Sequence, residues 1–341
     1  MRPEVFARFA VAVVALGGLA TYFAGAAPVA SQQVRPAAGT CQSGPNTLGV
    51  SRVVDIDATQ GPRFGGVQYR DHDFLQDGEV VLTFDDGPHP KYTVPILDAL
   101  DEQCVKATFY MVGRQALAFP KYAREVGRRG HTIGTHTWSH RNLARSSAEQ
   151  MRAEIELGIS AVQVALGGPT APFFRFPYLA APNTAQQMLQ QRDTANVSID
   201  VDSHDFRTRS PSRMISNVMN GLKSKRKGII LFHDIQPSTA LGIRQLLAEL
   251  KSHGYRVVHM RPKQTQSTIA EFDKRIERTH TPPNLEVAAG PVAHRGVTAP
   301  NWETQSAQHP RPVAAAPPAS AAAPRGRSVD DWRRSVFGGG Y

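Results

Sequence analysis

The chain has 341 residues, of which 41% are apolar, enough to bury one good-sized hydrophobic core with material to spare. Its formal net charge of +10 suits a protein that meets anionic envelope polymers or lipid surfaces. That charge alone is no evidence for nucleic-acid binding, so we expect no nucleic-acid partner.

The first residues have the pattern of an export signal. Arg2 and Arg8 precede an apolar stretch from Phe9 to Phe23, which is shorter than the roughly 20 residues that a membrane span needs. Residues 24–26 are small, as a signal peptidase requires, although a longer apolar run would instead permit an uncleaved anchor. We expect a signal peptide or signal anchor over residues 1–26. The protein would then be exported, to the periplasm or the outer face of the inner membrane.

Residues 27–74 have the composition of a linker followed by a short N-terminal extension. The segment up to about residue 50 is small, polar and rich in proline and glycine. Arg52–Ile56 and Val67–Tyr69 have the pattern of short strands, which would pack on the domain that follows.

The two cysteines of the chain are Cys41, in the linker, and Cys104. In an exported protein an even number of cysteines favours a disulfide over free thiols. A bridge between them would tie the extension to the domain and stabilise it by about 4 kcal/mol in the chain-entropy model.

From residue 75 onward, strand-like and helix-like patterns alternate, as an α/β barrel demands. Ser146–Glu149 offers a capping box for a long amphipathic helix. Ser210–Pro211 begins a further helix, and Gly254 ends the last one before a strand at Tyr255–Val258.

Two adjacent carboxylates, Asp85 and Asp86, follow the apolar strand-like run Val80–Leu82 and precede a Gly-Pro turn. Two carboxylates so close resist being ionised together unless a cation binds one of them or one of them takes part in proton transfer. On its own the pair could be a solvated acidic turn, and the segments downstream favour a metal-binding or acid–base site instead.

His136 and His140 lie four residues apart and would share one face if their segment were helical. Together with a carboxylate they predict a metal site with two histidines, one carboxylate and open coordination positions. A zinc hydrolase and a non-haem iron oxygenase both use such a set.

Three further polar segments end or follow apolar, strand-like runs: Arg175–Tyr178, Asp202–Phe206 and Leu231–Asp234. Polar residues placed repeatedly at the ends of buried strands are what a barrel with its site on one face requires.

The segment 263–341 is rich in proline and alanine and lacks the apolar periodicity needed to bury a core, apart from a short helix expected at Ile269–Arg278. We expect a disordered tail. Residues 329–337 could form an amphipathic docking helix. Envelope or membrane association could therefore come from this tail or from the N-terminal segment.

The five polar segments, in this order, resemble the motifs of the polysaccharide deacetylases, carbohydrate esterase family four, which share the NodB-homology domain. Gly87–Leu97, Lys106–Tyr110 and Gly130–Gly134 are also typical of that family. The resemblance covers roughly residues 75–262. It implies a distorted (β/α) barrel of the NodB-homology type, here with a short N-terminal extension and a disordered C-terminal tail.

The resemblance assigns roles to the first two motifs. Asp85 matches the catalytic base of the family, and Asp86, His136 and His140 match its metal ligands. Arg175 matches the arginine that holds the base carboxylate in place, and the opposite charge should keep that carboxylate ionised.

The remaining roles come from the last three motifs. The Tyr178 backbone N–H matches the oxyanion donor, and Asp205 matches the carboxylate that orients the general acid, His233. Leu231 matches the apolar residue that lines the acetyl-methyl pocket. Where the family often has tryptophan, this chain has Phe206, which leaves an apolar but smaller wall for the sugar or acetyl group.

The resemblance implies metal-dependent de-N-acetylation of an N-acetylhexosamine-containing glycan, such as peptidoglycan or a chitin-like polymer, by a monomer. We expect Zn²⁺ as the metal, with Co²⁺ or Ni²⁺ as alternatives. The rival activity is an O-acetyl polysaccharide esterase with the same machinery. A non-catalytic glycan-binding barrel would not need the acid–base pair Asp85 and His233, and an oxygenase would not explain Asp85, Arg175 and His233.

Overall fold

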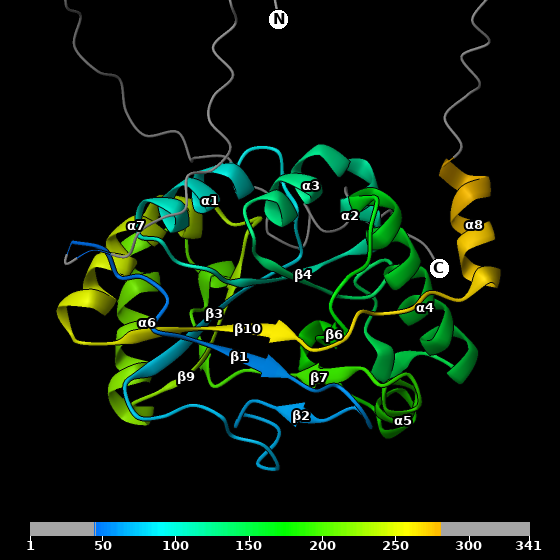
Figure 1. Ribbon diagram of the computed structural model, residues 1–341, viewed down its shortest axis with the longest axis horizontal. Helices are drawn as coiled ribbons and strands as arrows, with labels where there is room; N and C mark the ends of the chain where they lie inside the picture. The colour runs from blue at the N-terminus through cyan, green and yellow to red at the C-terminus, as the bar shows by residue number, and fades with distance from the viewer. Residues whose placement is uncertain (1–43, 45, 281–341) are drawn as a thin grey trace, which may run out of the picture. The chain divides into compact units, whose positions relative to one another are not determined.

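The structure, a computed structural model, describes residue 44 and residues 46–280 (Figure 1). Within these residues, ten strands form one sheet, and the pairings between strands are parallel. The strands are β1 (Arg52–Ile56), β2 (Arg63–Phe64), β3 (Glu79–Asp85), β4 (Thr108–Met111), β5 (Thr132–Thr135), β6 (Phe173–Phe174), β7 (Ala195–Val197), β8 (Val201–Asp202), β9 (Gly228–His233) and β10 (Arg256–Pro262).

Strand β3 is the hub of the sheet, because it pairs with β4, with β9 and, through its first residues, with β10. From β4 the order continues through β5, β6 and β7 to β2, and β9 carries β8. Strand β1 pairs along β10, and the two lie side by side in Figure 1. Parallel strands that alternate with helices are the predicted arrangement of an α/β barrel.

Helices alternate with the strands along the chain, and they cover the outer face of the sheet (Figure 1). The helices are α1 (Thr93–Glu102), α2 (Gly113–Ala118), α3 (Pro120–Arg128), α4 (Ala148–Leu166), α5 (Asn183–Gln191), α6 (Pro211–Lys225), α7 (Pro237–Ser252) and α8 (Ala270–His280). Three short 3₁₀ segments, η1 (Leu143–Arg145), η2 (Pro177–Leu179) and η3 (Asp205–Arg207), follow strand ends.

The alternation of side chains along β3 sorts them between two apolar clusters. Val80, Leu82 and Phe84 pack with the helices, whereas Val81 belongs to a second cluster with Tyr110 and residues of β6, β7 and β10. Because side chains of a strand alternate in direction, the next residues on the Val81 face are Thr83 and Asp85. The strand pattern thus carries Asp85 to the face opposite the helices, at the carboxyl end of β3.

Several local predictions are confirmed, and two are wrong. The strand Arg52–Ile56 has the predicted bounds, and Ser210 caps α6 through the Arg213 N–H. Val67–Tyr69 is a turn instead of a strand, because the N–H groups of Gln68 and Tyr69 both donate to the carbonyl of Gly65. The capping box of α4 lies one residue later than predicted, since Ser147 and Gln150 form it.

The predicted helix near Ile269–Arg278 is present as α8, but it is not part of a loose tail. Phe272 and Ile276 are buried against Leu157 and Ala161 of α4, and α8 lies along α4 in Figure 1. The folded unit therefore reaches beyond residue 262, to residue 280.

The predicted signal segment 1–26, most of the linker, the tail from 281 and the segment 329–337 lie outside the described residues. Among the helices of residues 46–280, none has the length and apolar content to cross a membrane.

Cys104 is buried after α1 and is disulfide-bonded, and its predicted partner Cys41 lies outside the described residues. We expect mass spectrometry of the exported protein, alkylated without reductant, to show a Cys41–Cys104 peptide pair and no alkylated thiol. Two alkylatable thiols in the absence of reductant would rule the bridge out.

Candidate active site

A cavity of about 310 Å³ opens at the carboxyl ends of the strands. Its walls come from segments far apart in the sequence, because each follows the end of a strand. The lining residues are Asp85, His136, His140, Phe176, Tyr178, Leu179, Asp202, Phe206, Arg207, Leu231 and His233. Seven of the ten sequence-predicted site residues line this cavity. The other three, Asp86, Arg175 and Asp205, are buried and contact lining residues.

Arg175 fixes the position of Asp85. Its side chain is 0% exposed, and Nη1 donates to Asp85 Oδ1 at 2.8 Å and to Thr83 Oγ1 at 2.7 Å. The same guanidinium donates to the carbonyls of Val197 and Ser198, at 2.9 and 3.0 Å. Because the planar Arg175 guanidinium donates to four acceptors, it is held in one orientation. The Asp85 carboxylate that accepts from it is therefore held in one place as well.

Burial and Arg175 act on Asp85 in opposite directions. Burial raises the pKa of Asp85 to about 6, although the Arg175 charge lowers it. Arg175 therefore favours the ionised carboxylate, as expected, although the guanidinium offsets only part of the desolvation. A carboxyl whose pKa lies near the working pH can accept a proton in catalysis.

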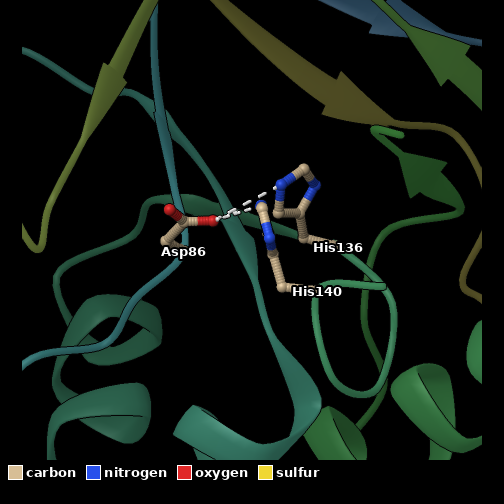
Figure 2. Close-up of side chains that lie close together, drawn as sticks. All are labelled: Asp86, His136 and His140. Carbon is tan, nitrogen blue, oxygen red and sulfur yellow. Dashed lines mark ion pairs between the residues drawn. The ribbon is translucent and has the colours of Figure 1, made fainter. Parts of the chain in front are cut away.

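Asp86, His136 and His140 converge on one point, as Figure 2 shows. Asp86 Oδ1 lies 3.1 Å from His140 Nε2 and 3.5 Å from His136 Nε2. All three side chains are buried, and their ligand atoms lie within 4.8 Å of one another. Two imidazoles and one carboxylate form a donor set that holds a divalent metal and leaves positions open.

The two histidines converge without the helix that the spacing suggested. His136 follows the end of β5, and the segment to His140 is an irregular loop with left-handed backbone at Thr137 (φ 66°) and His140 (φ 60°). The Thr137 hydroxyl accepts the His140 N–H at 3.0 Å, which closes the loop. The helical interpretation is therefore wrong, and a tight loop brings the rings together instead.

The surroundings of this cluster fit a bound cation. His136 Nδ1 lies 2.7 Å from the Arg175 carbonyl, which can only accept, so Nδ1 carries the proton and Nε2 offers its lone pair toward Asp86. Burial lowers the pKa of His136 to about 3, which keeps the ring neutral, as a metal ligand must be. Within the described part of the chain, no hydrogen bond satisfies the buried Asp86 Oδ1. An unsatisfied carboxylate oxygen beside two imidazoles is the arrangement that a cation would complete.

His233 and Asp205 form a second ion pair at the end of β9. His233 Nδ1 lies 2.7 Å from Asp205 Oδ1, and the His233 backbone N–H donates to Asp205 Oδ2 at 2.7 Å. The Thr239 hydroxyl donates to the same Oδ2 at 2.6 Å, so three donors hold the carboxylate. Burial alone would lower the pKa of His233, but Asp205, with smaller contributions from Asp86 and Asp85, raises it to about 10. The imidazole is therefore a cation at neutral pH and has a proton to give.

The remaining predicted residues form the walls of the cavity. Tyr178 is 54% exposed, and its ring lies edge-on to His140 with the centroids 4.7 Å apart. Phe206 lies edge-on to His233 at 5.5 Å, and Leu231, a buried residue of β9, also lines the cavity.

Left-handed backbone is concentrated around the cavity. Such backbone costs about 1–3 kcal/mol at each non-glycine residue and persists where the surrounding structure imposes it. The residues near the site that adopt it are Asp86, Thr137, His140, Tyr178, Leu179 and His204. The fold therefore holds the turns that present these side chains under local strain, which is typical of functional sites.

Sequence reasoning missed three residues that shape the site. Thr83 accepts from Arg175, and Thr239 supports Asp205. Arg207 lines the cavity. Thr83 and Arg207 each lie next to a recognised motif, and this position could have marked them as site residues. Nothing in the sequence marks Thr239.

The polysaccharide deacetylase family model matches residues 75–197. A chitooligosaccharide deacetylase of Azorhizobium caulinodans is 30% identical over 155 residues, which are 46% of this chain and 73% of that protein. The chain belongs to the polysaccharide deacetylase family. The family resemblance of its motifs is thereby confirmed.

Other members of the family are similar over a smaller share of their length. A peptidoglycan-N-acetylglucosamine deacetylase of Bacillus cereus is 32% identical over 184 residues, 53% of this chain and 66% of that protein. A peptidoglycan-N-acetylglucosamine deacetylase of Listeria monocytogenes is 32% identical over 180 residues, 52% of this chain and 37% of that protein. The chain thus spans less than two thirds of these polysaccharide deacetylases.

Solved structures confirm the fold. A Bdellovibrio bacteriovorus peptidoglycan deacetylase matches with a TM-score of 0.57 and 33% identity, over 62% of this chain and 59% of that chain. A peptidoglycan N-acetylglucosamine deacetylase matches with a TM-score of 0.51 and 29% identity, over 58% of this chain and 90% of that chain. The distorted barrel predicted from the motifs is therefore the fold of this family member.

Proposed function

We propose that this polysaccharide deacetylase family member hydrolyses the N-acetyl group of an N-acetylhexosamine-containing glycan and releases acetate. One observation carries the proposal. One cavity is lined by a carboxylate fixed by Arg175, by the two histidines of a buried Asp-His-His cluster and by a histidine kept protonated by Asp205. Amide hydrolysis needs a base, stabilisation of an oxyanion and a proton for the leaving amine, and these groups supply each requirement.

Asp86, His136 and His140 would hold the metal, and we infer Zn²⁺, with Co²⁺ or Ni²⁺ as alternatives, from the nitrogen and oxygen donors. A divalent ion bound there supplies a Lewis acid, which polarises the acetyl carbonyl and lowers the pKa of a water toward about 7.

Asp85 is the proposed base, which accepts a proton from the attacking water. Its carboxylate faces the cavity and cannot rotate, because Arg175 donates to Oδ1. The second oxygen, Oδ2, lies 3.9 Å from His136 Nε2, so the base lies beside the metal ligands. A fixed base next to the nucleophile's position lowers the entropic cost of attack.

His233 is the proposed acid, which delivers a proton to the departing nitrogen. Asp205 occupies Nδ1, so the other ring nitrogen is left to face the cavity. The Tyr178 backbone N–H is the proposed oxyanion donor, and Leu231 and Phe206 would enclose the acetyl methyl.

Substrate and location are inferred from the named relatives and the N-terminal pattern. Relatives named for peptidoglycan, chitin and chitooligosaccharide deacetylation support a polymer of N-acetylhexosamine as substrate. We infer an exported monomer with its deacetylase domain at about residues 75–262, acting in the periplasm or at the outer face of the inner membrane.

The test is to incubate the full-length protein with peptidoglycan, chitooligosaccharides and acetylated xylan, and to measure both acetate and newly formed primary amines. We expect the two products to rise together on an N-acetylated glycan. A chelator should abolish both, and added Zn²⁺ should restore them.

Two other outcomes would contradict the proposal. Acetate released from xylan without any amine would identify an O-acetyl esterase. Glycan binding without acetate release from any of the three polymers would identify a non-catalytic binding protein.

A further inference from the structure

Arg207 places a cationic side chain at the wall of the catalytic cavity. It ends η3, the 3₁₀ segment that begins at Asp205, and its guanidinium carbon lies 5.2 Å from the centre of the Phe206 ring. The Phe206 ring in turn lies 5.5 Å from the ring of His233. Arg207 and the proposed acid therefore line the same cavity on either side of the Phe206 ring.

Arg207 has no counter-charge within the described part of the chain. Over residues 46–280, no carboxylate lies within ion-pair distance of its guanidinium. The nearby Asp202 also lines the cavity, but its carboxylate accepts the backbone N–H of His204 at 2.8 Å. Asp85 is held by Arg175.

We propose that Arg207 makes the site selective for glycans that carry carboxylates beside the acetamido group. This inference rests on the proposed function. A guanidinium presents a rigid fork of donors that binds a carboxylate through two parallel hydrogen bonds. The Arg207 side chain is exposed, and its guanidinium lies within cation–π distance of the Phe206 ring, a contact that favours this side-chain position before the substrate arrives.

A neutral glycan gives this cation no comparable partner. Hydroxyl groups accept single hydrogen bonds, whereas a charge-assisted pair is roughly twice as strong as a neutral one. The site should therefore prefer an acidic N-acetylhexosamine polymer over a neutral one such as chitin. The carboxylate could belong to an acidic ether substituent of the sugar or to a peptide attached to it.

The test measures binding rather than turnover, by titration calorimetry on full-length Asp85→Asn protein loaded with Zn²⁺. Four ligands are compared: a neutral chitooligosaccharide, peptidoglycan strands with peptides, peptide-free strands, and peptide-free strands whose carboxylates have been converted to amides. Each is measured with Arg207 intact, with Arg207→Gln and with Arg207→Lys. Arg209→Gln is the matched control, because Arg209 is exposed two residues away and does not line the cavity.

We expect Arg207→Gln to weaken binding of carboxylate-bearing strands about tenfold relative to the neutral oligosaccharide, and added salt to reduce the difference. Amidated strands should bind as weakly to the intact protein as acidic strands bind to Arg207→Gln. Arg207→Lys should retain part of the preference, and Arg209→Gln all of it. If the preference for acidic strands persists without peptides, the recognised carboxylate belongs to the sugar. If the preference requires the peptides, the carboxylate belongs to the peptide.

Equal binding of the acidic strands, both with and without peptides, and of the amidated strands would overturn the role of Arg207. Equal weakening of acidic and neutral ligands by Arg207→Gln would overturn it too, because it would show that Arg207 only supports Phe206. Neither result would contradict the proposed deacetylase activity. That proposal is contradicted separately if the wild-type protein releases no acetate.

Discussion

Asp85→Asn should leave the metal bound and reduce kcat for acetate release about a thousandfold. The amide cannot take a proton from the attacking water, but its oxygen can still accept the Arg175 hydrogen bond that Asp85 accepts at 2.8 Å. Metal content by mass spectrometry and kcat on the same preparation separate the two effects. Normal turnover by Asp85→Asn would show that Asp85 is not the base.

The metal ligands should behave differently from the base. Asp86→Ala and His140→Ala should lose metal and activity together, because each removes one of three ligand atoms. His253→Ala is the matched histidine control, since His253 is exposed at the end of α7 and contacts Glu249. It should keep both metal and turnover.

Asp85→Asn also carries a stability cost that must be measured beside activity. Removing one partner of a buried ion pair leaves a buried charge and costs about 3–5 kcal/mol. Here Arg175 keeps its hydrogen bonds to Thr83 and to two carbonyls, so we expect a lowered Tm and a folded protein. A thermal melt therefore distinguishes lost chemistry from lost structure.

The sequence predicted the barrel because its strongest local signals agree with the global fold. The apolar runs before Asp85 and before His233 become β3 and β9, strands buried along their whole length. Continuous apolar runs are what parallel strands covered on both faces require. Since the carboxyl ends of such strands meet, the polar residues that follow them could be assigned to one site.

What the sequence could not predict depends on contacts between distant segments. The spacing of His136 and His140 allowed a helix, but the backbone follows a loop closed by Thr137. The composition of Val67–Tyr69 is typical of a strand, but the segment forms a turn because two of its N–H groups donate to the Gly65 carbonyl. Burial and the Arg175 charge shift the pKa of Asp85 in opposite directions, and both effects arise only once the barrel surrounds the two groups.

His233→Ala should lower the rate of N-deacetylation by about a hundredfold or more and hydrolysis of an activated aryl acetate much less. An amine must be protonated as it leaves, whereas a phenolate leaves without a proton. Comparing kcat/KM of the variant on a chitooligosaccharide and on an aryl acetate measures the difference. An equal loss on both substrates would assign His233 a structural role.

The pH profile gives this prediction a second readout. Burial alone would lower the pKa of His233, but Asp205 raises it to about 10, so the proton needed for catalysis is lost only above that pH. In Asp205→Asn the largest raising contribution is gone, whereas burial and the smaller raising charges of Asp86 and Asp85 remain, so the pKa of His233 should fall well below 10. The alkaline limb of kcat/KM should therefore move down by several pH units. An unmoved limb would mean that another group titrates there and that His233 is not the acid.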